Sequence, residues 1–281
     1  MFESIVGNTF SDVYSDLINV ILNSQPRECR YAHDVNAKNK PTSELTLYSK
    51  CVQFTVLNPR FCCYKNPIRQ PSFNVGKKEG MMLFSDSNNV DYVPWYRPFS
   101  RDGKTSYSMY GQFINPKIDR IVNKLRAKPI TRQCVFTIYN MDINVWDDDV
   151  TDVPCTLMGI FDISDTSNYK ALNLTIMMRS NDLYLGTPYN MMMFSYLQQV
   201  VANELGLALG SYTHFVNNLH IYYSNISQLE ESLKYPFEDV IMSIPYGVSE
   251  ARRVAKTYME KIDEENKQKA SMGQGNTWPL W

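Results

Sequence analysis

The chain has 281 residues, of which 44% are hydrophobic and 13% aromatic, enough for one sizeable buried core. Its 28 basic and 29 acidic side chains leave a net charge of -1, which excludes the strongly basic footprint of many nucleic-acid-binding and membrane-surface proteins. No apolar run is long enough to cross a membrane, and the first residues lack the regions of a secretory signal. We expect a cytoplasmic protein with no membrane or nucleic-acid partner.

Cysteine and histidine spacing gives no sign of a metal centre. The six cysteines form no Cys-x-x-Cys pair, and the three histidines lie at no metal-ligand spacing from them. In a reducing compartment such cysteines are by default small buried apolar groups. The sequence therefore predicts neither a zinc site nor a disulfide framework.

The chain starts with a helical pattern, a polar stretch and strands. Apolar residues at helical spacing predict a helix over residues 10–24, with Ser11 as its N-cap. Residues 25–40 are polar and aperiodic, which predicts a loop. Alternating residues from 44 to 60 predict one or two strands.

The middle of the chain alternates loops with short elements. Residues 64–111 are rich in Pro, Asn, Ser and aromatic residues, which is typical of a functional loop, and a short helix is expected at 75–85. An amphipathic pattern predicts a helix at 116–128, followed by a strand at 132–140. The acidic run at 144–152 is expected to be a solvated loop.

The last part of the chain is expected to hold the centre of the core. Residues 155–163 and 171–178 predict a hairpin of two strands. Residues 188–206 are apolar almost all round, so this helix must be buried in a core or at a subunit interface. A charged surface helix at 249–270 precedes a tail, 271–281, that is expected to be mobile.

Polar side chains gather in the segment "MRSNDLYLGTPYN", residues 178–190, between the second strand and the buried helix. Such groups must each find a partner or cost a few kcal/mol when they lose water. The cluster therefore indicates a ligand or a polar network.

Several motifs in one order resemble the thymidylate synthase superfamily, which includes phage pyrimidine-nucleotide hydroxymethylases. The order is Pro-Cys, two strands, Arg-Ser-x-Asp, Gly-x-Pro-aromatic-Asn, a long buried helix and His-x-Tyr, and the match covers about residues 118–226. The resemblance implies an α/β fold: one thymidylate-synthase-like domain over residues 1–270, with a large twisted mixed β-sheet flanked by helices.

The resemblance implies catalytic roles for several side chains. Cys155 matches the nucleophile that adds to carbon 6 of the pyrimidine, and only its thiolate can attack. Glu79 resembles the acid that relays a proton near the carbonyl at position 4, and Tyr110 the group that, with water, removes the proton from carbon 5. Asp182 matches the aspartate that supports the base. We expect the positive charge of Arg179 to lower the pKa of Cys155.

The resemblance also implies which residues hold the nucleotide. Arg179 and Ser180 match residues on the phosphate, for which a guanidinium fork is well shaped. Asn190 matches the asparagine that reads the uracil edge. His220 and Tyr222 match the pair on the 3'-hydroxyl of the sugar.

Two more arginines are expected at the phosphate. Arg132 resembles the first of two adjacent arginines that family members lend across a dimer, and Gln133 stands where the second would be. Arg27 lies in a stretch that matches loosely and is assigned to the phosphate there. The resemblance therefore implies a homodimer in which Arg132 crosses the interface.

The implied reaction is one-carbon transfer from methylenetetrahydrofolate to carbon 5 of dUMP. Hydride from the folate would then give thymidylate, whereas water would give 5-hydroxymethyl-dUMP. Thr156 stands where reductive members have histidine, and Met82 where they have tryptophan. With the polar residues Ser85, Asp86 and Asn88, they indicate a pocket that admits water, so we expect the hydroxymethyl product.

Other functions stay open at this point. They are a thymidylate synthase, a dCMP hydroxymethylase and a catalytically silent nucleotide-binding homologue. Asn190 favours uracil because its amide both donates and accepts, whereas cytosine-specific relatives have aspartate there. The cytoplasm would be that of a host if the protein is encoded by a phage.

Overall fold

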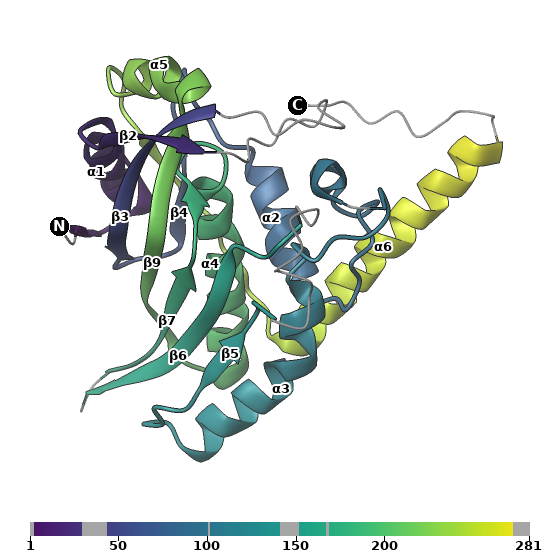
Figure 1. Ribbon diagram of the computed structural model, residues 1–281. Helices are drawn as coiled ribbons and strands as arrows, with labels where there is room; N and C mark the ends of the chain where they lie inside the picture. Colours follow the sequence, from purple (N-terminus) through teal and green to yellow (C-terminus); the bar gives the residue numbers. More distant parts are fainter. Residues whose placement is uncertain (1–2, 30–43, 101, 141–151, 167–168, 272–281) are drawn as a thin grey trace.

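The computed structural model describes residues 3–29, 44–100, 102–140, 152–166 and 169–271 (Figure 1). Its main sheet has the strand order β1-β3-β9-β7-β6-β5, with β2 beside β3 and β8 beside β9. A small second sheet pairs β4 with β10. The strands are β1 (Glu3–Gly7), β2 (Gln25–Cys29), β3 (Glu44–Val56), β4 (Phe61–Lys65), β5 (Val135–Thr137), β6 (Thr156–Thr166), β7 (Tyr169–Met178), β8 (Asn181–Asp182), β9 (Ala208–Tyr222) and β10 (Glu238–Ile241).

Helices pack on this sheet and on each other. In Figure 1 the strands run through the left half of the view, and α2, α3 and α6 stand to their right. The helices are α1 (Phe10–Leu22), α2 (Phe73–Met82), the 3₁₀ helix η1 (Pro94–Phe99), α3 (Gly111–Ala127), α4 (Thr187–Leu205), α5 (Tyr223–Ser232) and α6 (Val248–Ser271). The predicted α/β fold with a large mixed sheet flanked by helices is confirmed.

The mixed sheet follows from the connections between its strands. β6 and β7 are antiparallel neighbours in the chain, as in the predicted hairpin. β7 and β9 are parallel, so the chain must cross over between them, and α4 makes that crossover. α4 ends at Gly206, whose φ of 66° is the left-handed conformation of a helix C-cap.

The apolar helix predicted over residues 188–206 is buried as expected. α4 contacts β7 and β9 on one side and α2, α3 and α6 on the others. Its side chains from Met191 to Ala202 are all buried. α4 therefore forms the middle of the core, and its first turn reaches the polar segment at 178–190.

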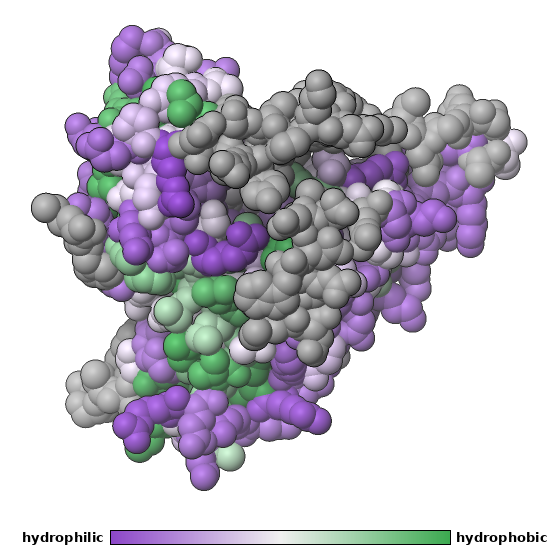
Figure 2. Space-filling view, viewed as in Figure 1, coloured by the Kyte–Doolittle hydropathy of each residue, from purple (hydrophilic) through white to green (hydrophobic). Residues whose placement is uncertain are grey.

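The other face of the sheet carries apolar side chains that the helices leave half-buried. Met158, Met177 and Phe215 lie side by side because the strand register aligns them across β6, β7 and β9. Figure 2 shows hydrophobic residues gathered over this part of the sheet, and Val135 on β5 is exposed. Apolar patches of this kind often mark protein interfaces.

Local predictions at the starts of two helices were wrong. Thr9, not Ser11, caps α1, because Thr9 and Asp12 form a capping box and leave Ser11 buried in the helix. α3 starts at Gly111 rather than at Pro116, which lies inside the helix.

The expected loop at 25–40 was also partly wrong. Residues 25–29 pair with β3 as the strand β2. The sequence did not indicate this strand, because alternation is hard to see in so short a polar segment. Residues 30–40 lie outside the described part of the chain, as does the tail beyond Ser271.

Other expectations concern metals, disulfides and membranes. Within the described residues, no group of His, Cys, Asp and Glu side chains is placed to hold a metal ion. Cys51, Cys62, Cys63, Cys134 and Cys155 are free thiols. No helix in the described ranges is both long and apolar enough to span a membrane.

Candidate active site

The structure brings Cys155 and Arg179 together where β6 starts and β7 ends. The backbone N–H of Arg179 donates to the carbonyl oxygen of Cys155 at 2.9 Å. The Arg179 guanidinium donates from Nε to the Pro154 carbonyl at 3.1 Å and from its terminal nitrogen to the Val153 carbonyl at 2.9 Å. Arg179 therefore fixes the backbone that carries the thiol.

The charge of Arg179 does not make the Cys155 thiol acidic. Burial raises the pKa of Cys155 above its ordinary value, Arg179 lowers it, and the carboxylates of Asp152 and Asp182 raise it again. The charge of Arg179 acts in the expected direction, but burial prevails and the pKa of Cys155 is raised overall. The guanidinium donates to backbone carbonyls rather than to the thiol. A sequence pattern does not reveal how far the thiol is removed from water.

Glu79 lies on α2 in a buried position. Trp95 donates from Nε1 to its carboxyl group at 2.7 Å, and the Tyr96 hydroxyl also hydrogen-bonds to it. Burial raises the pKa of Glu79 to about 7, although both hydrogen bonds oppose that shift. A carboxyl group with such a pKa can give or take a proton near neutral pH.

Tyr110 stands at the start of α3, against the start of β6, which follows Cys155. Its hydroxyl accepts from the backbone N–H of Thr156 at 3.4 Å, and its ring stacks on Phe194. A Cβ on Gly111 would lie 2.1 Å from the Met82 carbonyl oxygen, so only glycine allows α3 to start so close to the end of α2. This close approach explains why the Tyr-Gly pair holds the phenol beside Cys155.

Glu79 and Tyr110 line the same small cavity. Its volume is about 10 Å³, and Tyr96, Ser108 and Met193 also line it. That is about the space that one water molecule needs. The carboxyl group of Glu79 and the phenol of Tyr110 therefore belong to residues that face one shared cavity.

Asp182 shapes the turn that leads into α4. Its Oδ1 accepts from the backbone N–H groups of Tyr184 at 2.7 Å and Leu185 at 2.9 Å. Its carbonyl oxygen accepts from the Thr187 hydroxyl at 3.0 Å. Asn190 follows on the first turn of α4, so the polar segment at 178–190 is partly a structural network.

His220, Tyr222 and Arg27 gather at one end of the sheet. Asp182 pairs with His220 between β8 and β9, and the His220 ring meets the Tyr222 ring edge-on at 5.4 Å. Thr46 on β3 pairs with Tyr222 on one side and with Arg27 on the other. The exposed guanidinium of Arg27 lies over the ring of Tyr48, whose strand partner is His220. Ser180, half-buried, immediately precedes β8.

Arg132 lies far from Cys155 of its own chain. It is exposed in the turn between α3 and β5, in a shallow hollow with Lys128 and Gln133. The carbonyl oxygen of Cys134 accepts from the N–H of Phe161, which places this turn beside the middle of β6. From Cys155 to Phe161, β6 spans about 20 Å at a rise of about 3.3 Å per residue.

The polar residues expected around Cys155 have partners within the protein. Ser85 is buried with its hydroxyl 3.2 Å from the Met259 sulfur, and Asp86 accepts from the Asn115 side chain at 2.8 Å. Thr156 is the member that lies beside Tyr110, and it is fully buried. Met82 ends α2 where the resemblance places tryptophan, and the indole that reaches Glu79 comes instead from Trp95 in η1.

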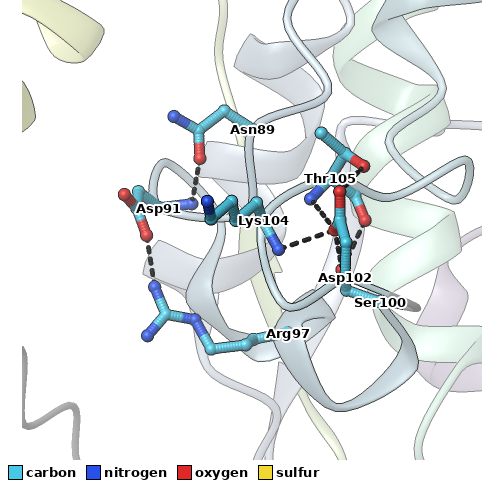
Figure 3. A network of polar contacts seen from close by, with 7 residues as sticks. All are labelled: Asn89, Asp91, Arg97, Ser100, Asp102, Lys104 and Thr105. Carbon is cyan, nitrogen blue, oxygen red and sulfur yellow. Dashed lines mark hydrogen bonds and ion pairs between the residues drawn. The ribbon is translucent and has the colours of Figure 1, made fainter.

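Sequence reasoning missed Trp95, Tyr96 and Asp152. Trp95 and Tyr96 belong to η1, in a loop that further polar contacts brace (Figure 3): Arg97 pairs with Asp91, and Asp102 closes a separate turn. Asp152 ends the acidic run and is buried, not solvated. The aromatic richness of residues 92–99 was the available signal for Trp95 and Tyr96.

Comparison with known proteins matches residues 88–270 to the family model described as thymidylate synthase. The chain belongs to the thymidylate synthase family. Glu79 and Arg27 lie before the matched residues.

Individual relatives of this family carry two different names. A thymidylate synthase of Streptococcus gordonii is 27% identical over 179 residues, which cover 62% of this chain and 63% of the relative. A deoxyuridylate hydroxymethyltransferase of Bacillus phage SP01 is 29% identical over 194 residues, which cover 59% of this chain and 50% of the relative. The chain thus spans less than two thirds of the length of these curated relatives.

A solved structure shows the same fold. The thermostable thymidylate synthase A from Bacillus subtilis superposes with a TM-score of 0.63 at 20% identity, covering 82% of this chain and 85% of that one. At this identity the likeness supports the thymidylate synthase fold and leaves the reaction to be argued from the site.

Proposed function

We propose that the chain transfers a one-carbon unit to carbon 5 of dUMP through a covalent adduct at Cys155. The observation that carries the proposal is that an acid and a phenol line one small pocket, and that the phenol also contacts the residue that follows Cys155. The Tyr110 hydroxyl touches the residue after Cys155, and Glu79, whose pKa is about 7, lines the same cavity as Tyr110. These are the groups that the reaction needs.

Each group has a step in the proposed mechanism. Carbon 5 of uracil is a poor nucleophile, and addition of the Cys155 thiolate at carbon 6 makes it a good one. Glu79 exchanges a proton near the carbonyl at position 4, and Tyr110, through water, removes the proton from carbon 5. Because the Cys155 pKa is raised, the thiol must lose its proton as the nucleotide binds.

Methylenetetrahydrofolate supplies the one-carbon unit when it is bound. Its flat ring system needs apolar surface beside the nucleotide, and the residues present fit that need. Leu185 is 52% exposed in the turn before Asn190, and Trp95 and Tyr189 are half-buried. We assign these side chains to the folate.

The nucleotide is held by the strand ends. Arg179, Ser180 and Arg27 serve the phosphate, and His220 with Tyr222 serves the sugar. Asn190 reads the base, since its amide can donate to one uracil carbonyl and accept from the ring N–H. Asp182 holds the turn between these groups and supports the base.

The proposed product is 5-hydroxymethyl-dUMP. Thr156 places a buried hydroxyl, rather than an imidazole, directly after Cys155 and beside Tyr110. Such a hydroxyl can hold a water molecule near carbon 5. The alternative product, thymidylate, is favoured by the Trp95 indole on Glu79, because an aromatic wall there would exclude water.

We further propose that the active form is a homodimer. The apolar side chains of Met158, Met177 and Phe215 give a second copy a surface on which to pack. The turn that carries Arg132 lies beside Phe161, about 20 Å along the sheet from Cys155 of the same chain, so we assign Arg132 to a phosphate in the second copy.

Release of tritium from [5-3H]dUMP in the presence of methylenetetrahydrofolate tests the proposal. We expect release by the native chain and none by Cys155→Ala. No release by the native chain would leave a nucleotide-binding homologue, and release from labelled dCMP alone would indicate a cytosine enzyme. Mass spectrometry of the product then separates hydroxymethyl from methyl.

A further inference from the structure

Asp152 is a buried carboxylate three residues before the nucleophile. It is 4% exposed and accepts four hydrogen bonds from a single turn. The backbone N–H groups of Tyr107 and Ser108 donate at 2.7 Å and 3.1 Å, and the hydroxyls of Ser106 and Ser108 at 3.2 Å and 2.7 Å. These bonds replace the water that the charge loses on burial.

The turn that Asp152 holds leads directly to Tyr110. Gln112, on the first turn of α3, donates from its side chain to the carbonyls of Ser106 at 2.9 Å and Met109 at 3.0 Å, so the turn is also tied to α3. Ser108 lines the cavity that Glu79 and Tyr110 share. A shift of this turn would therefore move the phenol and the wall of the cavity together.

The segment from Asp152 to Cys155 is held from both sides. Arg179 binds the carbonyls of Val153 and Pro154, and Asp152 binds the turn before Tyr110. The Tyr110 hydroxyl then meets the Thr156 N–H, which closes a loop of contacts around Cys155. Each contact joins parts of the chain that are far apart in sequence.

We propose that Asp152 is a positioning residue that sets the distance between the Cys155 thiol and the Tyr110 hydroxyl. The inference rests on the proposed function, because it assigns Asp152 to the step in which both groups act on one base. Asp152 is buried and its four hydrogen bonds go to residues 106–108, so we assign it no contact with the base or the folate. Its effect is on geometry, where an error of about 1 Å can cost about 100-fold in rate.

Asp102 is a matched control in the loop that carries residues 106–108, the hydrogen-bond partners of Asp152. It also accepts four hydrogen bonds, from Ser100, from Lys104 and twice from Thr105 (Figure 3). All of its partners lie within three residues in sequence, and Asp102 is exposed. Its removal opens one local turn and leaves the contacts around Cys155 in place.

The test compares Asp152→Ala with Asp102→Ala in the full chain, using tritium release from [5-3H]dUMP. We expect Asp152→Ala to lower kcat about 10- to 100-fold with the KM for dUMP within about threefold, and Asp102→Ala to change neither by more than about twofold. Ser108→Ala removes one hydroxyl bond without deleting the carboxylate and should lower kcat several-fold. Equal kcat values for all three variants and the native chain would overturn the proposal.

Alkylation by iodoacetamide, followed on the Cys155 peptide by mass spectrometry, separates this inference from the proposed function. The charged and titratable groups around Cys155 are Arg179, Asp152, Asp182 and Tyr110. Asp152→Ala frees the segment and removes a carboxylate that opposes thiolate formation, so the rate should rise several-fold, whereas Asp102→Ala should leave it unchanged. If the native chain releases no tritium, the proposed function fails. The alkylation rate of Cys155 then by itself supports or overturns the positioning role of Asp152.

Discussion

The two sides of the candidate site are built in different ways. On the side proposed to hold the nucleotide, Asp182 and His220 are strand partners, and Arg179 directly follows the end of β7. On the chemical side, Glu79 and Tyr110 come from helices, and a third segment carries the indole that binds Glu79. Strand register is sufficient to assemble a binding surface, whereas shifting a pKa also requires burial by distant segments.

Glu79→Gln should have the largest effect and tests the chemical side. The amide keeps the size of the side chain but cannot exchange a proton, so kcat should fall about 10²- to 10⁴-fold with little change in the KM for dUMP. Glu204→Gln is the control, since Glu204 pairs with Arg126 away from the pocket. A loss that appears only in KM would place Glu79 on the binding side.

The raised pKa of Glu79 also predicts a dependence of stability on pH. The folded protein keeps Glu79 protonated up to about pH 7, whereas the unfolded chain releases this proton near the ordinary value of 4.5. Below pH 4.5 the protonated group therefore destabilises the folded protein little, and the free energy of unfolding falls as pH rises from about 4.5 to about 7.

The size of this effect follows from the shift in pKa. Above pH 7 the ionised Glu79 should lower the free energy of unfolding of the native chain by about 3 kcal/mol. The stability of Glu79→Gln relative to the native chain should therefore rise by about that much between pH 5 and pH 8. Urea unfolding at both pH values measures the difference. A gap that does not change with pH would mean that Glu79 ionises freely.

Asn190→Asp sharpens the comparison on the nucleotide side. A carboxyl group can accept from the exocyclic amine of cytosine, whereas the native amide can present a donor to it. The ratio of kcat/KM for dUMP to that for dCMP should fall about tenfold or more, because a mispaired polar group costs about 1–3 kcal/mol. An unchanged ratio would show that Asn190 does not read the base.

Arg27→Ala should have the smallest effect. The guanidinium is exposed and lies over Tyr48, so the loss should be confined to phosphate binding. We expect the KM for dUMP to rise severalfold with kcat unchanged, as for an exposed charged contact. Arg253→Ala, on the surface of α6, serves as the control and should alter neither constant.

How much could be predicted from the sequence differs between the two sides. The hairpin of β6 and β7, the buried α4 and the polar segment between them follow from periodicity and from motifs that are continuous in sequence. Residues before 88 carry weaker signals, and Glu79 was proposed because it resembles a short motif. On the side proposed to hold the nucleotide, strand register brings Asp182 and His220 together.

The chemical side was harder to predict from the sequence, because it depends on packing between segments that are distant in the chain. Asp152 is buried although it ends an acidic run, since four donors from residues 106–108 replace its water. Trp95 serves Glu79 from a loop, so the position of Met82 gave a misleading signal. The pKa of Cys155 depends on how dry the thiol is, which sequence patterns do not reveal.

The most direct test of the account is to trap the nucleotide on Cys155. With 5-fluoro-dUMP and methylenetetrahydrofolate, the reaction should stop after carbon–carbon bond formation, because fluorine cannot leave carbon 5 as a proton does. Mass spectrometry of the digested protein should then find the nucleotide and the folate together on the peptide that contains Cys155, and find neither in Cys155→Ala. An unmodified Cys155 peptide, or the same mass on another cysteine, would contradict the account.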